Sequence, residues 1–106
     1  MRKVEINPGV CGFITRVQAE LLDEDELKLS VQSDCPSITK MMEALDDIFE
    51  PFELCLQRPG QGPLFEYAQE NFPVHVSCPA ICGIIKCAEV EAGLALPKDA
   101  SIKFVG

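Results

Sequence analysis

The chain has 106 residues, the length of one compact domain, and six of them are cysteines, a share below the roughly 8–10% of disulfide-built secreted domains. Hydrophobic residues make up 47% and charged residues 25%, so we expect one globular domain spanning residues 1–106. Nine Lys and Arg against 17 Asp and Glu give a net charge of -8. Phosphate groups require a basic surface, so we expect no nucleic acid and no membrane among the partners.

The amino terminus carries charges where a signal peptide needs an apolar stretch. The longest apolar-rich segment, Val74 to Ala88, is interrupted by polar residues, proline and glycine, and is therefore no membrane span. We expect a cytoplasmic protein. In a reducing cytosol, cysteines are thiols, metal ligands or redox groups more often than permanent disulfides.

The first third of the chain has the pattern of a strand meander. Strands are predicted over Arg2–Ile6, Phe13–Leu21 and Leu27–Ser33, because apolar and polar residues alternate there. The acidic run Asp23–Glu26 separates the second and third strands, and four adjacent carboxylates favour an exposed hairpin tip.

After Cys35-Pro36 the hydrophobic period changes from two to about 3.6. The predicted elements are a helix from there to Phe49 ended by Pro51, a strand over Phe52–Gln57, a helix over Leu64–Asn71 opened by Pro63, a strand over Val74–Val76, a helix over Pro79–Ala92 capped by Gly93, and a strand over Ala100–Val105. The order of elements predicts an α+β fold in which the N-terminal antiparallel three-strand meander belongs to a mixed sheet with about three helices packed on it.

Two Cys-Pro pairs each stand at the predicted start of a helix. Proline suits the first helical turn, so Cys35 and Cys78 are expected at the N-cap positions. Cysteine is not a preferred N-cap residue, so capping alone does not account for its use at both positions. Free N–H groups and the helix dipole at this position favour the thiolate, which is the form that binds metals and reacts.

The predicted hairpin brings a third cysteine to the same place. Cys11 precedes the second strand and Cys35 follows the third, so both belong to the end of the sheet opposite the acidic tip. If the strand before Cys78 runs parallel to the third strand, Cys78 joins this end as well. The hypothesis is that the three cysteines converge; the alternative is three buried core cysteines.

The remaining candidates differ in their positions. On a helix, Cys78 and Cys82 lie roughly 40° apart and Cys82 and Cys87 roughly 140° apart, so Cys82 is the candidate fourth ligand, and Cys87 is expected in the core or an interface. Cys55 is expected in the core. His75 is the sole histidine, and either a ligand role or a structural one fits its place in an apolar segment.

The C-terminal sequence, from Ser77-Cys78-Pro79 through Glu89-Val90-Glu91-Ala92-Gly93-Leu94-Ala95-Leu96-Pro97-Lys98-Asp99, resembles a family of small, functionally uncharacterised, cysteine-containing proteins of anaerobic bacteria and archaea. The strong resemblance covers about a quarter of the chain, and the segments around Cys11 and Cys35 fit it more loosely. The resemblance implies that Cys11, Cys35 and Cys78 belong to the family pattern, whereas Cys82 and Cys87 stand where apolar residues are commoner. It implies no activity.

Three functions fit these observations. The first is a metal-binding protein in which Cys11, Cys35 and Cys78, with Cys82 or an outside ligand, hold zinc or an iron–sulfur cluster. The second is a thiol redox or persulfide-carrier protein that uses Cys78 as its nucleophile. The third is an acidic interaction subunit, with structural cysteines, that binds a protein partner or forms a homo-oligomer. The sequence leaves open whether the protein is an enzyme.

Overall fold

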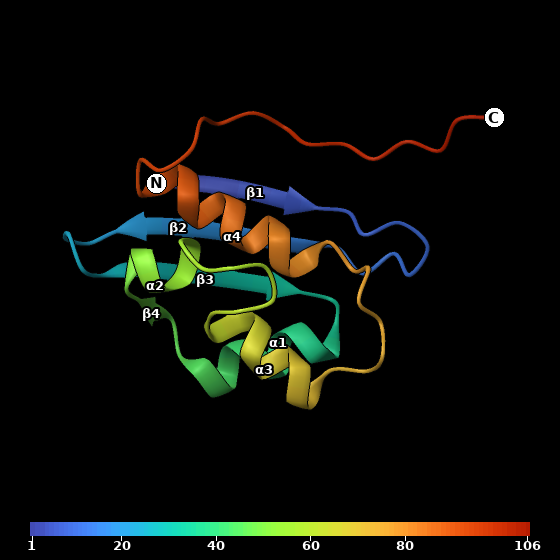
Figure 1. Cartoon of the computed structure of the whole chain (residues 1–106), viewed down its shortest axis with the longest axis horizontal. Coiled ribbons are helices and arrows are strands. Elements are labelled where there is room, and N and C mark those ends of the chain that lie inside the picture. Colours follow the sequence, from blue (N-terminus) through green and yellow to red (C-terminus); the bar gives the residue numbers. More distant parts are fainter.

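The first half of the chain forms an antiparallel sheet in the computed structural model, which describes residues 1–106 (Figure 1). Its strands are β1 (Arg2–Ile6), β2 (Thr15–Leu21), β3 (Leu27–Ser33) and β4 (Ile48–Phe49), in the spatial order β1-β2-β3-β4. Every neighbouring pair is antiparallel, and Val17 lies opposite Val4 on one side and Val31 on the other. The three-strand meander is confirmed, while the sheet is antiparallel throughout rather than mixed.

Four helices follow the meander, and two of them lie directly against the sheet (Figure 1). They are α1 (Pro36–Leu45), the short α2 (Pro51–Cys55), α3 (Pro63–Asn71) and α4 (Ala80–Glu91). α4 lies across β1 and β2, α1 packs on β3, and α2 and α3 contact the other helices. The predicted α+β fold with three main helices is therefore confirmed.

Alternation along β2 separates a covered face of the sheet from an open one. Thr15, Val17 and Ala19 are buried under the helices, while the residues between them are exposed. A strand alternates its side chains between two faces, so this pattern leaves the second face of the sheet in water.

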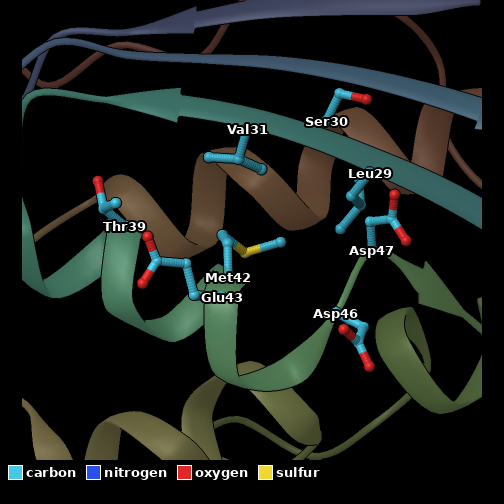
Figure 2. A pocket seen from close by; sticks show the side chains of 8 residues that line it. All are labelled: Leu29, Ser30, Val31, Thr39, Met42, Glu43, Asp46 and Asp47. Carbon is cyan, nitrogen blue, oxygen red and sulfur yellow. The ribbon is translucent and has the colours of Figure 1, made fainter.

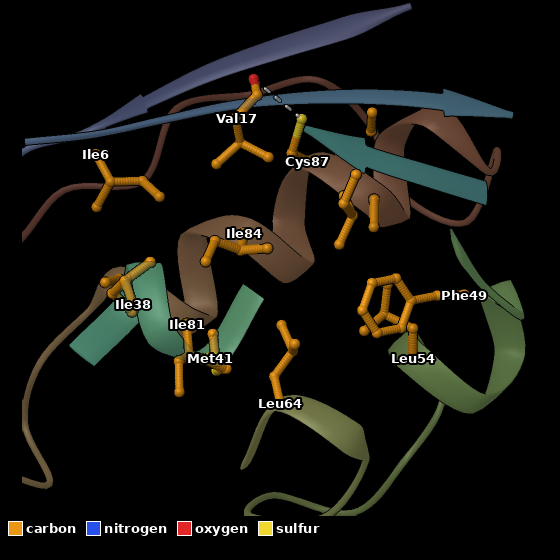
Figure 3. Packing of buried hydrophobic residues seen from close by; sticks show 14 of the residues in the cluster. Ile6, Val17, Ile38, Met41, Phe49, Leu54, Leu64, Ile81, Ile84 and Cys87 are labelled. Carbon is orange, nitrogen blue, oxygen red and sulfur yellow. Dashed lines mark hydrogen bonds between the residues drawn. The ribbon is translucent and has the colours of Figure 1, made fainter. Parts of the chain in front are cut away.

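The core lies between the sheet and α4 (Figure 3). Ile84 and Cys87 of α4 are fully buried, and the Cys87 thiol donates to the Val17 carbonyl oxygen at 3.9 Å and the Arg2 carbonyl oxygen at 3.4 Å. Gly83 stands against Ile6, and a Cβ at position 83 would overlap with the Ile6 side chain. The absence of a side chain at Gly83 therefore sets how closely α4 approaches β1.

The chain between α1 and α3 differs from the sequence prediction. α1 ends at Leu45 because Asp46 takes a left-handed conformation (φ 62°), and Phe49 then pairs with Leu27 as part of β4. Pro51 does not end a helix but opens α2, whose first turn is capped by the Glu50 carboxylate. The strand predicted over Phe52–Gln57 is therefore wrong.

Two further predicted strands are absent. Val74–Val76 forms an exposed loop, in which both valine side chains point into solvent. Ala100–Val105 is extended and has no strand partner. Strand propensity alone does not make a strand, because the backbone groups need a neighbour to bind.

The start of α3 and the end of α4 follow the sequence prediction more closely. α3 begins at Pro63, as predicted, and α4 is followed by Gly93 in the left-handed conformation (φ 78°). The Gly93 N–H donates to the Val90 carbonyl oxygen and the Leu94 N–H to that of Glu89, which closes the helix. No helix of the structure is both long enough and apolar enough to cross a membrane.

Gly83→Ala should destabilise the protein, although alanine has a higher helix propensity than glycine. The added methyl group would overlap with the Ile6 side chain, and such overpacking costs about 1–3 kcal/mol, against a helix gain of about 1 kcal/mol. Urea unfolding of Gly83→Ala, of Ile6→Ala and of the pair measures this. The pair should lose less stability than the two single variants together, because Ile6→Ala removes both atoms that the new methyl group would overlap with. A Gly83→Ala variant more stable than the parent would contradict the close contact.

Candidate functional site

Three cysteine-bearing segments meet at one end of the sheet. The start of β2 and the end of β3 pair through Thr15 and Ser33, and the Asp34 N–H donates to the Ile14 carbonyl oxygen at 3.1 Å. The end of β1 reaches the first turn of α4, where Ile6 meets Gly83. The loop after β1, the start of α1 and the chain entering α4 thus lie at this end, opposite the acidic hairpin (Figure 1).

Cys35 is held in place through its backbone. Its N–H donates to the Ser33 hydroxyl oxygen at 3.1 Å, and that hydroxyl lies 2.7 Å from the buried Thr15 hydroxyl. The carbonyl oxygen of Cys35 accepts from the Thr39 N–H at 3.1 Å. Cys35 is the N-cap of α1, as predicted, and its thiol makes no capping hydrogen bond. The half-buried side chain therefore remains available for other chemistry.

Cys11 belongs to an exposed turn between β1 and β2. The Gly12 N–H donates to the Gly9 carbonyl oxygen at 3.0 Å, and the Asn7 side chain accepts from the Gly9 N–H at 3.0 Å. Both glycines have positive φ, 98° and 71°, a conformation that favours glycine. The turn thus carries the Cys11 thiol in solvent, beyond the end of the sheet.

Cys78 lies one residue outside the position predicted for it. The N-cap of α4 is Pro79, which already has helical dihedral angles (φ -82°, ψ 0°) and accepts from the Gly83 N–H at 3.0 Å. The N-cap prediction for Cys78 is therefore wrong, because the helical conformation begins at the proline. The thiol is half-buried and packs against the hydrophobic core.

No three side chains of His, Cys, Asp or Glu lie close enough together to hold a metal ion. The structure brings the segments of Cys11, Cys35 and Cys78 to one end of the sheet, and the ligand set that they would form with Cys82 stays a prediction. His75 lies in the exposed loop before α4, outside any such group.

Two of the six free thiols, those of Cys55 and Cys87, have raised pKa values. Burial raises the pKa of the Cys87 thiol, which is fully buried under the sheet. Burial and then the carboxylates of Glu89 and Glu50 raise the pKa of Cys55 to about 12. Cys87 therefore lies in the core, as expected, whereas Cys55 is half-buried against the core, and the raised pKa lowers the share of reactive thiolate at both residues.

A hollow of about 260 Å³ between α2, α3 and α4 was not expected from the sequence. Cys55 and Cys82 both line it, together with Arg58, Lys86 and Glu89. The sequence did not indicate this arrangement, because Cys55 was expected in a strand and instead belongs to α2. The helical spacing of Cys82, Lys86 and Glu89 is the signal that they share one face of α4.

A second hollow, of about 380 Å³, lies between β3 and α1 (Figure 2). Leu29, Val31 and Met42 line its floor, and Glu43, Asp46 and Asp47 line it with carboxylates. One of these carboxylates, Asp47, lies 4.0 Å from the Lys28 ammonium. The carboxylates do not gather around a common point, so the groove is an acidic surface and no cation site.

The fold and the candidate site together define a small α+β protein with helices on one face of an antiparallel sheet and six free thiols. The chain belongs to a family of unknown function (DUF6951), whose model matches residues 2–104. The match covers nearly the whole chain and so extends well beyond the C-terminal motif. No curated protein and no solved structure matches the chain.

Alkylation of the folded protein should separate the packed thiols from the accessible ones. At pH 9 only about one Cys55 thiol in a thousand is ionised, because its pKa is about 12, and Cys87 has no path to solvent. Iodoacetamide should therefore label Cys11 and Cys82 and leave Cys55 and Cys87 nearly unlabelled, as measured by peptide mass mapping. Labelling in urea, where all six thiols should react, is the control. Fast labelling of Cys87 in the folded protein would contradict its buried position.

Proposed function

We propose that the protein is a thiolate metal-binding protein, in which Cys11, Cys35 and Cys78 hold zinc or an iron–sulfur cluster, with Cys82 or an outside group as the fourth ligand. One observation carries the proposal. Three segments that bear accessible or half-buried thiols lie at the same end of the sheet, while Cys55 and Cys87 lie elsewhere. Thiolates are soft ligands that suit both zinc and iron–sulfur clusters.

The turn that carries Cys11 is the part that would complete the site. Cys35 and Cys78 are fixed by helix starts and by packing, whereas Cys11 is exposed between two glycines in left-handed conformations. Metal binding supplies free energy that can order such a turn, because the ligands need not be in place before the ion arrives. The C-terminal motif resembles proteins of anaerobic bacteria and archaea. The oxygen-free interior of such cells would keep these thiols reduced.

A second candidate is thiol chemistry at Cys78, and one observation favours it: no three ligands lie within range of one ion. In this reaction the Cys78 thiolate attacks a substrate disulfide, and Cys35 or Cys82 attacks the resulting mixed disulfide. Two protein thiols are then oxidised to a disulfide as one substrate disulfide is reduced to two thiols. A persulfide carrier is the related alternative: the Cys78 thiolate takes the outer sulfur of a donor persulfide, releasing the donor thiolate, and an acceptor thiolate then takes that sulfur, with no net oxidation.

Anaerobic purification followed by metal analysis and an absorption spectrum distinguishes the two candidates. We expect bound zinc, or the charge-transfer absorption of an iron–sulfur cluster, in the parent protein. Cys35→Ser and Cys78→Ser should each lower metal affinity by about tenfold or more, because each removes a proposed ligand.

Cys55→Ala is the matched control, since it removes a thiol that packs against the core without belonging to the proposed ligand set. It should keep the metal and lose stability. Metal-free protein after reconstitution with zinc and with iron and sulfide would contradict the metal proposal. If Cys78→Ser then abolished reactivity toward a disulfide reagent, the second candidate would take its place.

A further inference from the structure

The last residues of the chain form an exposed segment without a partner. The C-terminal segment, residues 96–106, is extended and makes a single backbone hydrogen bond, from the Lys98 N–H to the Leu96 carbonyl oxygen (2.9 Å). The Ile102 and Phe104 side chains are 87% and 102% exposed. Large apolar side chains arranged in this alternating pattern are typical of a strand whose neighbour is missing.

The sheet has a matching open edge at β1. β1 pairs only with β2, so the backbone groups on its outer side have no strand partner. Val4 and Ile6 of β1 face α4 and pack on the core, and Lys3 and Glu5 face the open side of the sheet. An uncovered edge strand is a ready template for pairing with another chain.

We propose that the C-terminal segment of a second copy of this chain adds to β1 as an antiparallel fifth strand, and that the exchange is reciprocal and gives a two-fold dimer. This inference concerns assembly and is independent of the proposed metal function. The interface would be isologous, since each copy contributes one β1 edge and one C-terminal segment.

One register satisfies both faces of the new strand pair. With Val4 opposite Phe104, Ile6 lies opposite Ile102, so apolar residues meet on the face that α4 covers. On the other face Glu5 then lies opposite Lys103, a pair of opposite charges. Apolar match and charge match thus come from the same alignment.

Neighbouring registers lose these matches. A shift of one residue turns Lys103 toward the apolar face, because side chains alternate. A shift of two residues in one direction places Lys103 opposite Lys3, and a shift of two in the other places Lys103 opposite Asn7, so both lose the pair with Glu5. Only the register that pairs Glu5 with Lys103 keeps both the ion pair and the two apolar pairs.

The direction of the segment indicates a second copy as the donor. α4 ends near the start of β1, where the Met1 ammonium lies 3.4 Å from Glu91. The C-terminal segment then runs past the sheet in the same direction as β1 (Figure 1). A chain's own segment would therefore approach β1 in parallel, whereas a two-fold axis perpendicular to the strands reverses the partner's segment into the antiparallel direction.

Sedimentation equilibrium and light scattering of the full chain test the proposal. We expect twice the chain mass of 11.6 kDa for the parent. Phe104→Asp should raise the dimer dissociation constant by about tenfold or more, because it places a charge in the apolar pair with Val4. Folding of the variant is not at risk, since the Phe104 side chain is fully exposed in the single chain.

Val74→Asp is the matched control, because Val74 is equally exposed, at 108%, and lies in the loop before α4. It should leave the dissociation constant unchanged. Lys103→Glu should weaken the dimer by about threefold, and adding Glu5→Lys should restore it. Glu5→Lys also removes the ion pair between Glu5 and the exposed Arg16 (3.2 Å). The dissociation constant of the double variant is therefore compared with that of Lys103→Glu rather than with that of the parent.

A parent protein that is monomeric at every concentration would overturn the proposal, and so would a dimer that Phe104→Asp leaves intact. Metal content serves as an independent measurement, since Phe104→Asp should not change it. Loss of the dimer with unchanged metal content supports the interface, whatever the outcome for the cysteine site.

Discussion

The close packing of α4 on the sheet is the contact on which the rest of the structure depends. Gly83 allows the helix to lie directly against Ile6, and the buried side of α4 then supplies Ile84 and Cys87 to the core. The same contact fixes the start of α4 at the sheet end where β1 finishes. The Cys78 segment therefore reaches the same end of the sheet as the Cys11 and Cys35 segments through a helix rather than through the parallel strand that the sequence suggested.

The fold divides the cysteines according to their solvent access. Cys87 is enclosed under the sheet, and burial beside carboxylates keeps Cys55 protonated. Cys35 and Cys78 stand just before helices and pack against the core, whereas Cys11 lies exposed in the turn between β1 and β2. Chemistry at this end of the sheet depends on how far the Cys11 turn closes on the other two.

Only one of the two edges of the sheet is covered. Next to β3, α1 and the short β4 cover part of the edge, whereas β1 leaves its outer side open, and the segment that would suit this edge belongs to the same chain but runs in the wrong direction. An α+β protein of this size gains core area when a second copy completes its sheet. The thiol end and the open edge are separate features, because the first depends on loops and helix starts and the second on a strand.

The sequence determined the elements whose signals are local. Alternation located β1 and β3, and Pro63 and Gly93 marked where helices begin and end, because proline fixes a helical φ and glycine adopts the left-handed conformation that closes a helix. Only the tertiary structure decided that Phe49 pairs with Leu27 and that residues 100–105 have no neighbour, since strand pairing depends on backbone groups distant in the sequence. The cysteine positions in the sequence indicated a common sheet end, but the separation of the sulfurs depends on loop conformation and side-chain packing, which no spacing along the chain specifies.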